Sequence, residues 1–521
     1  MLKKVLKINL KVLGAIVLGL VLVQIVSAYF FGIIAEKQFD SQFTKMTDSK
    51  FIQVVNKSYS RGWFTSSMDV TLAVNNQAIK NFVTMLPLKT QESSFQLPKS
   101  GYQLSYKTHI TNGLFAGWIN GNVLPTIAYS TTDLKLPESL NNVLKTFFKD
   151  EQPIAISNIL YLNSSGKYKI YSPVFRYEEA LSGVKVNWGG LKWDVAYDSK
   201  FNKFDNSFSV PGLDLSAPTK GDISFKNLYY TANSSRSIHD IKVGNTMLDL
   251  ESFSINLTES STSDLKLGEV IRVFTGINSA DFLNGLDIIN PTRFTMSEVH
   301  FKSISSDENN YFAANVKASF ESLVSNKLTY GPMEFDFSLD HILADKFSAV
   351  VDTLNDEAGL TDAERDVHKV QTIQALKTNL TPLFIESPVI QLNKLTLKTP
   401  TGLISVSGKA TTNGFESADM NDKTKFMSKL SLKVDFSIPK PVMSYLFLLQ
   451  MKYFLTAGNA QMDQQSSDAL AKVVNILLDN QLQVWQKKGF IQESDGNLSS
   501  VIAMESGVMS LNGHPTTASP N

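Results

Sequence analysis

The sequence predicts a β-dominated α+β protein in which an N-terminal transmembrane helix precedes long, curved antiparallel sheets packed with a few amphipathic helices. Two patterns predict this: one uninterrupted apolar stretch near the N-terminus, and apolar residues that alternate with polar ones along much of the remaining chain. Composition agrees, because 43% hydrophobic residues in a 521-residue chain can form a sizeable core and are too many for a disordered protein.

Charge and cysteine content exclude several classes of protein. The 49 basic and 49 acidic residues cancel, so no overall field favours a nucleic acid, and we expect no nucleic-acid partner. Without cysteine the fold has no disulfide, no thiolate metal site and no cysteine nucleophile.

The first element is an apolar helix from Val12 to Ile34, about 34 Å long and therefore long enough for a hydrocarbon core of about 30 Å. Its clearly polar members are Gln24 and Ser27, and aromatic residues lie near its end, as is typical of a membrane interface. The predicted anchor positions include Val12, Leu18, Leu22, Phe30 and Ile34.

The orientation follows from the lysines. Lys3, Lys4, Lys7 and Lys11 precede the apolar stretch, whereas the charges that follow it cancel, so the N-terminus is predicted to be cytoplasmic and the body external. The alternative is a signal peptide cleaved after Ala28, because residues 26–28 fit a small-residue cleavage pattern. The apolar stretch continues beyond that cut and exceeds the usual length of a signal core, which favours an uncleaved anchor.

Strands are predicted next from period-two patterns at 68–74, 312–320, 333–339 and 430–438. Each pattern buries one face, which suits antiparallel sheets. Between Leu250 and Phe253 the parity changes, which indicates a β-bulge or a turn. Turn signals are the pairs Arg61-Gly62, Asn112-Gly113, Pro211-Gly212 and Asn512-Gly513, and the segment 400–402.

Helices are predicted at five places. Residues 36–50 continue the anchor outward, 140–148 form a short helix, and the capping box Thr361–Glu364 opens a helix that ends before Pro382. Pro441 begins a helix through 451, and the apolar stripe of 470–478 belongs to a helix that Gly489 ends.

The predicted domain organisation is simple. Residues 1–35 form the cytoplasmic tip and anchor, residues 36–513 form the periplasmic β-rich body, and residues 514–521 form a mobile tail. A weak division into subdomains is expected between 276 and 291.

Motifs of catalysis and metal binding are missing from the sequence. The six histidines are dispersed, and we find no phosphate-binding loop, nucleophile elbow or zinc-protease motif. The adjacent His239 and Asp240 are interpreted as a surface pair, because neighbours on a strand face opposite sides. We therefore expect a protein that is not an enzyme and has no cofactor.

The segment 58–66 has two interpretations. As a recognition loop, Arg61 would bind an anion and Trp63 would be an apolar anchor. As a hairpin, Gly62 would supply an unusual backbone angle while Trp63 or Phe64 packs inward, and this second interpretation is favoured.

The same segment, following an N-terminal anchor, resembles the opening signature of the bacterial YdgA/YihF-like family of unknown function. Further segments resemble family motifs in the same order: 109–115, 186–191, 210–213, 330–333, 399–402 and 507–515. In 109–115 this sequence departs from the His-Gly-Pro-Phe pattern, because Thr111 and Asn112 intervene and the proline is missing. The motif or recognition positions are Arg61, Gly62, Trp63, Phe64, Gly113, Trp188, Gly190, Pro211, Gly212, Gly331, Pro332, Pro400, Gly402, Asn512 and Gly513.

This resemblance implies an inner-membrane anchor and a periplasmic β-rich body, and it brings no catalytic residue. From the architecture we expect a non-enzymatic envelope protein whose partners are the lipid bilayer and an amphiphile or lipid that it binds or guides. An envelope scaffold that binds other proteins is the alternative, and a hydrolase built from dispersed residues ranks last.

Overall fold

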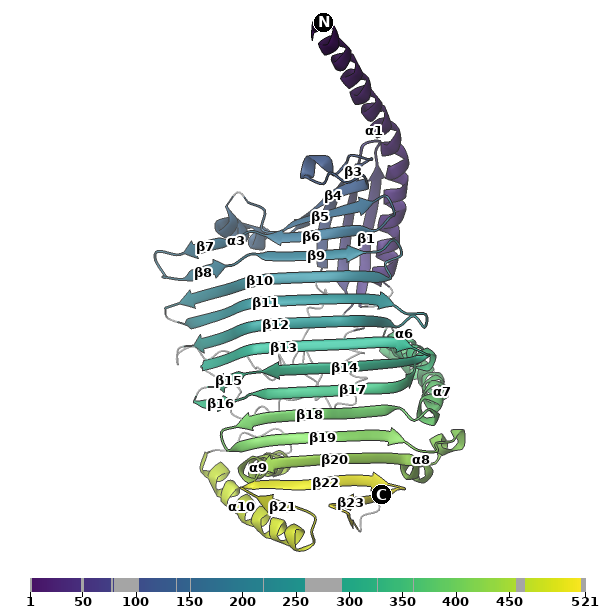
Figure 1. Cartoon of the computed structure of the whole chain (residues 1–521). Helices are drawn as coiled ribbons and strands as arrows, with labels where there is room; N and C mark the ends of the chain where they lie inside the picture. The colour runs from purple at the N-terminus through teal and green to yellow at the C-terminus, as the bar shows by residue number, and fades with distance from the viewer. Residues whose placement is uncertain are drawn as a thin grey trace.

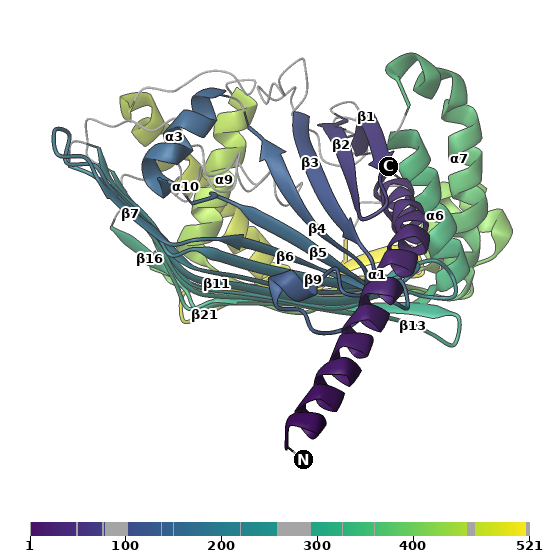
Figure 2. The same cartoon turned by 90° about the horizontal axis from the view of Figure 1, so that it is seen from above.

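The computed structural model describes residues 2–47, 51–75, 78, 103–136, 138–149, 151–218, 220–257, 293–325, 327–358, 360–455 and 464–516. Over these residues the chain forms one long antiparallel sheet with helices beside it (Figure 1). Seen from above, the sheet is curved, and α3, α6, α7, α9 and α10 lie on its concave side (Figure 2). The predicted strand-dominated α+β class is confirmed.

The sheet runs almost in sequence order. Its N-terminal half contains β1 Ile52–Arg61, β2 Thr65–Val74, β3 Gln103–Asn112, β4 Thr126–Lys135, β5 Ala155–Tyr161, β6 Gly166–Ser172, β7 Phe175–Glu178, β8 Lys185–Trp188, β9 Leu191–Tyr197, β10 Lys203–Ala217, β11 Gly221–Arg236 and β12 Lys242–Leu257. Successive strands pair from β1 to β6, then β9 joins β6 to β10, and β8 pairs with another part of β10.

The C-terminal half continues the same meander. It contains β13 Arg293–Glu308, β14 Tyr311–Phe320, β15 Ser322–Ser325, β16 Leu328–Tyr330, β17 Met333–Leu343, β18 Val389–Thr399, β19 Gly402–Thr412, β20 Leu430–Pro439, β21 Gln492–Ser494, β22 Asn497–Glu505, β23 Val508–Leu511 and β24 His514–Pro515. The order β12-β13-β14-β17-β18-β19-β20-β22-β23-β24 places the C-terminus at the end of the sheet opposite to α1 (Figure 1).

The helices are α1 Leu2–Thr47, α3 Glu138–Phe148, α6 Ala344–Ala358, α7 Asp362–Ile385, α8 Lys423–Lys429, α9 Lys440–Leu455 and α10 Gln464–Lys487, with short 3₁₀ segments η1 Trp118–Asn120 and η2 Ser417–Asn421. The predicted continuation of the anchor, the helices at 140–148, 361–380, 441–451 and 470–489, and the capping box of Thr361 and Glu364 are confirmed. Helices α6 and α8 were not predicted from the sequence.

The predicted end of α7 is wrong, because the helix continues through Pro382 to Ile385. The ring of Phe384 packs against Phe415 and Phe426, and Leu383 is buried in the core formed with α6. The backbone N–H of Glu386 still donates to the Pro382 carbonyl, so the last turn closes although proline supplies no donor itself.

The parity change near Glu251 is neither a turn nor a bulge of one strand. Glu251 has no partner in the strand ladder, and neither has Asn227 of β11 or Glu298 of β13 at the same level. Asn227 and Glu298 have positive φ, of 50° and 49°. Because each of the three strands skips one residue at this level, the register on either side stays one to one. The predicted turn at Pro211-Gly212 is also wrong, since both residues lie within β10, with Pro211 at this unpaired level.

Two predicted boundaries lie at 276–291 and at His514. The division expected at 276–291 lies outside the described residues. Of the tail predicted from His514 to Asn521, His514 and Pro515 form β24 and the Thr516 N–H donates to the Met509 carbonyl, while residues 517–521 lie outside the described part of the chain.

Candidate functional site

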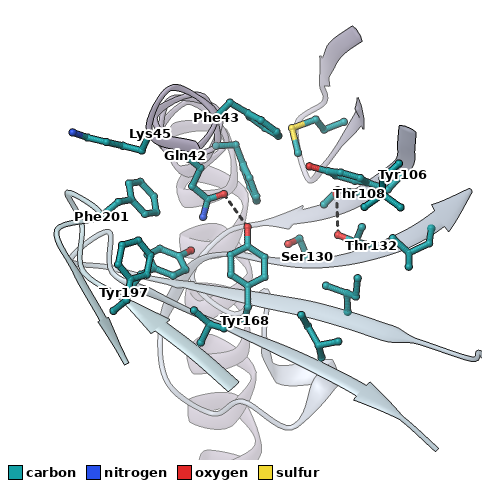
Figure 3. A pocket seen from close by; sticks show the side chains of 18 of the residues that line it. Gln42, Phe43, Lys45, Tyr106, Thr108, Ser130, Thr132, Tyr168, Tyr197 and Phe201 are labelled. Carbon is teal, nitrogen blue, oxygen red and sulfur yellow. Dashed lines mark hydrogen bonds between the residues drawn. The ribbon is translucent and has the colours of Figure 1, made fainter. Parts of the chain in front are cut away.

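A cavity of about 560 Å³ lies between the C-terminal part of α1 and the inner face of the first strands. The α1 side chains Phe39, Gln42 and Phe43 cover one side, while strands β2 to β6, β9 and β10 form the other (Figure 3). The spacing of Ala35, Phe39 and Phe43 places them on one face of the helix, which packs on Met68, Val70 and Ile110 beside the cavity.

Apolar side chains dominate the strand side of the cavity. These side chains project from alternate positions of each strand, so they lie on one face of the sheet. That apolar face borders an open space here, besides packing against other side chains. The apolar lining residues on the strands are Met68, Leu104, Leu134, Ile156, Ile170, Val195 and Phe204.

The polar groups of the interior are uncharged and mostly paired with protein atoms. The Tyr168 hydroxyl donates to Gln42 Oε1 at 2.8 Å, which ties α1 to β6 across the cavity (Figure 3). The Thr108 and Thr132 hydroxyls share a hydrogen bond of 2.9 Å. These pairs satisfy buried hydroxyls without placing a charge in the apolar space.

Burial keeps the tyrosines around the cavity neutral. It raises the pKa of Tyr106 to about 12 and raises the pKa of Tyr168 well above its ordinary value. Burial also raises the pKa of Tyr197, although Asn158 accepts a hydrogen bond from its hydroxyl at 3.1 Å. The described lining of the interior therefore supplies hydroxyl groups and no acid or base that titrates near neutral pH.

These pKa shifts predict a loss of stability at alkaline pH. Tyr106 ionises near pH 10 in the unfolded chain and near 12 in the folded one, so stability is intact below pH 10 and falls between about 10 and 12. The contribution of Tyr106 is about 2 to 3 kcal/mol. We expect Tyr106→Phe to reduce the decrease in Tm between pH 9 and pH 11.5; an unchanged decrease would contradict this assignment.

All charged residues among the described lining are cationic. Arg236 and Lys242 adjoin Phe201, Asn202 and Phe204, and Lys45 lies on the same side as Phe201 with its ammonium directed away from the apolar space (Figure 3). Arg236 Nη1 contacts both carboxylate oxygens of Asp240 at 2.6 and 2.7 Å, and Lys242 lies 5.8 Å from the Phe204 ring. The charged groups of the described lining therefore lie at one end of the cavity, where Asp240 neutralises Arg236 and Lys242 remains beside the Phe204 ring.

A second set of contacts joins α1 to the end of the sheet nearest the N-terminus. Gln24 Nε2 donates to the Asn112 carbonyl at 3.1 Å, and Gln24 Oε1 accepts from the Phe115 N–H at 3.0 Å. The Leu114 N–H donates to Ser27 Oγ at 3.2 Å. The two polar residues of the predicted anchor thus bind the loop after β3, rather than lying unpaired within an apolar helix.

His239 and Asp240, which were interpreted as adjacent surface residues and not as a catalytic pair, contact different partners: the His239 ring contacts Asp307 at 2.9 Å, and Asp240 pairs with Arg236. Burial raises the pKa of the Asp307 carboxyl, but hydrogen bonds from Ser237 and His239 outweigh it and hold that pKa below its ordinary value. The serine hydroxyl contacts the carboxylate instead of the imidazole, so this group lacks the serine–histidine contact of a hydrolase. Among the described residues, no three His, Asp or Glu side chains are grouped to hold a metal ion.

A family model described as a bacterial protein of unknown function (DUF945) matches residues 7–518. The chain belongs to this family. No curated protein and no solved structure is significantly similar to it. Membership in DUF945 agrees with the unknown-function family expected from the motifs, and it assigns no ligand.

The opening motif of this DUF945 protein forms the β1–β2 hairpin beside α1. Arg61 Nη1 contacts Glu36 at 3.0 Å, and Trp63 Nε1 donates to the Ile25 carbonyl at 2.8 Å. Gly62 does not have positive φ; a Cβ there would lie 2.3 Å from the Thr65 carbonyl oxygen. Trp63 and Phe64 are half exposed, so the inward packing expected of one of them is wrong.

The other DUF945 motif positions lie at turns and strand contacts along the sheet. Gly113, with φ of 120°, lies against Gln24, and Trp188 Nε1 donates to Ser172 Oγ at 3.0 Å. Asn512 Oδ1 accepts from the Val501 N–H at 2.8 Å. The structure does not bring these dispersed positions together. Gly212 and Gly402 lie within β10 and β19, and the positions between strands or in turns are Gly190, Gly331, Pro332, Pro400 and Gly513.

Sequence analysis missed the cavity residues, since none of the motif positions lines it. The signal was present as Phe39 and Phe43 on one side of the helix and as the alternating strands. The predicted anchor positions Leu18, Leu22, Phe30 and Ile34 are exposed on α1, and Val12 lies within the same helix.

Proposed function

We propose that this DUF945 protein is a single-pass inner-membrane protein whose periplasmic body binds an amphiphile and catalyses no reaction. Within DUF945 we place it among the YdgA/YihF-like proteins whose motifs it resembles. Within Leu18–Lys45, α1 contains a stretch that is long and apolar enough to span a membrane, with a mean hydropathy of 2.2. The lysines before Val12 favour a cytoplasmic N-terminus.

The cavity beneath α1 is the observation on which the amphiphile proposal rests. Its described lining combines an apolar, uncharged interior with one end that carries Lys242 and the Arg236–Asp240 ion pair. This arrangement matches a ligand that has an acyl chain and an anionic headgroup, because burial favours the chain and the Lys242 ammonium compensates the headgroup charge.

Its position favours a ligand that comes from the membrane. Phe39 and Lys45 follow the last apolar turn of α1 on the same helix, so the cavity begins within about 10 Å of Ile34 along the helix axis. A scaffold protein has no need of an apolar cavity beside its anchor, which is why we favour lipid binding over the scaffold alternative.

Photo-crosslinking in native membranes tests this function. A benzophenone amino acid at Ile170 would face the cavity, whereas the same residue at Tyr171 would face the opposite side of β6. We expect mass spectrometry of the purified full chain to find lipid adducts at position 170 and few at position 171. A folded protein without lipid adducts at 170, or with equal adducts at both positions, would overturn the proposal.

A further inference from the structure

The charge-free part of α1 is longer than the hydrocarbon core of a bilayer. No charged residue occurs between Lys11 and Glu36, a distance of about 37 Å along a helix, and Glu36 pairs with Arg61 at 3.0 Å. This length exceeds a hydrocarbon core of about 30 Å and approaches the full bilayer thickness of about 40 to 45 Å. Lys11 and the Glu36–Arg61 pair therefore mark the two polar boundaries of the span.

The body extends past the second of these boundaries. Its loop after β3 binds Gln24 and Ser27, and Trp63 binds the Ile25 carbonyl. Gln24 precedes Glu36 by twelve residues, or about 18 Å along the axis. This depth is greater than the thickness of one interfacial region, so a bilayer that covers the apolar part of α1 also surrounds these loops.

The loops have the composition that such a position requires. We define the collar as residues 62–64 and 113–125, neither of which contains a charged residue. Val123 and Leu124 are 77% and 56% exposed, and Trp63, Phe64 and Trp118 are also exposed. Tryptophan and exposed aliphatic side chains on a charge-free surface favour the membrane interface.

Many backbone N–H groups of the collar are hydrogen-bonded within the protein and therefore do not need water as a partner. The N–H groups of Gly113, Ala116, Trp118 and Gly121 donate to carbonyl oxygens within the loop and β4, as do others in the same segment. The Leu114 and Phe115 N–H groups bind α1 side chains. Hydrogen-bonded backbone lowers the cost of leaving water.

We propose that the collar inserts into the leaflet on the body's side of the membrane that contains α1, so that the sheet is held against the bilayer by its own end and not only by a single helix. This inference rests on the proposed membrane anchor. It assigns a lipid-contacting role to Trp63, Trp118, Val123 and Leu124, and it explains why an apolar anchor retains Gln24 and Ser27.

Site-directed fluorescence tests the collar, and the chain suits it because it has no native cysteine. The full chain in phosphatidylethanolamine–phosphatidylglycerol nanodiscs would carry one cysteine labelled with the polarity-sensitive dye NBD. The variants are Leu124→Cys in the collar, Leu18→Cys in the anchor and Val508→Cys at the opposite end of the sheet. Val508 is a matched control, because it is apolar and 55% exposed.

We expect the dyes at positions 124 and 18 to emit at shorter wavelength and to be quenched by spin-labelled lipid, while the dye at 508 is quenched by iodide. If position 18 reports lipid but position 124 behaves like 508, the collar proposal is wrong and the anchor stands. If position 18 itself reports water, the anchor and the collar both fail. The substitution at 124 removes an exposed side chain, so folding is preserved.

Discussion

Replacing Ser130 by tryptophan should reduce lipid adducts at position 170 at least tenfold. Ser130 lies on β4, is almost fully buried and faces the middle of the cavity (Figure 3). An indole ring there leaves no continuous space for an extended acyl chain. The substitution uses existing open volume, so its cost in stability should stay at or below the about 1 to 3 kcal/mol typical of overpacking.

The matched control is Thr131→Trp on the same strand. Thr131 is exposed and faces the opposite side of the sheet, so its replacement adds the same ring without entering the cavity. Adducts at position 170 should remain at the level of the parent protein in this variant. If Ser130→Trp folds with an unchanged Tm and keeps its adducts, lipid does not occupy this cavity.

The strands predicted at 68–74, 312–320, 333–339 and 430–438 were predictable because each has a local alternating pattern that burial of one face of the sheet causes. In an antiparallel sheet with one covered face, residues such as Met68 and Val70 must alternate with polar ones, and β2 follows that alternation. The capping box of Thr361 and Glu364 is local in the same sense, because both partners lie within four residues.

The candidate site depends on distant contacts and was therefore not predictable from these patterns. The cavity joins residues from Phe39 to Lys242, and each of them fits an ordinary core or surface position in its own element. Gln24 and Ser27 are two polar residues in an otherwise apolar helix, and nothing near them in the sequence explains their presence. Their partners lie 87 to 91 residues away, in the loop after β3. No spacing within the helix indicates such partners.

The errors at Pro211 and Pro382 have a common physical origin. Proline signals a turn or a helix end because it supplies no backbone donor, yet both residues lie within longer elements. Pro211 lies at a level where the neighbouring Asn227 is also unpaired, so β10 loses no ladder contact to it. Near Pro382, the packing of Leu383 and Phe384 outweighs one missing hydrogen bond.

Replacing Phe39 by alanine should cost about 3 to 5 kcal/mol, as is typical of a deeply buried ring. Phe39 is 4% exposed and belongs to the core that joins α1 to β2, β3 and β4, and its ring also lines the cavity. The replacement therefore both weakens the attachment of α1 and enlarges the apolar space beside it. Hydrogen exchange in nanodiscs should show faster exchange in these three strands.

Phe30→Ala provides the matched control on the same helix, because Phe30 is 58% exposed and lies within the charge-free span. In the proposed anchor the Phe30 ring faces acyl chains, so its removal creates no cavity and should change exchange in β2 to β4 little. Among the described strands, α1 packs mainly on the first four, β1 to β4, and sheet contacts elsewhere join near neighbours. Exchange in β18 to β22 should therefore stay unchanged in Phe39→Ala. Equal exchange in both variants would mean that the packing of Phe39 does not stabilise the first strands. The claim that α1 is a fixed cover of the cavity would then be wrong.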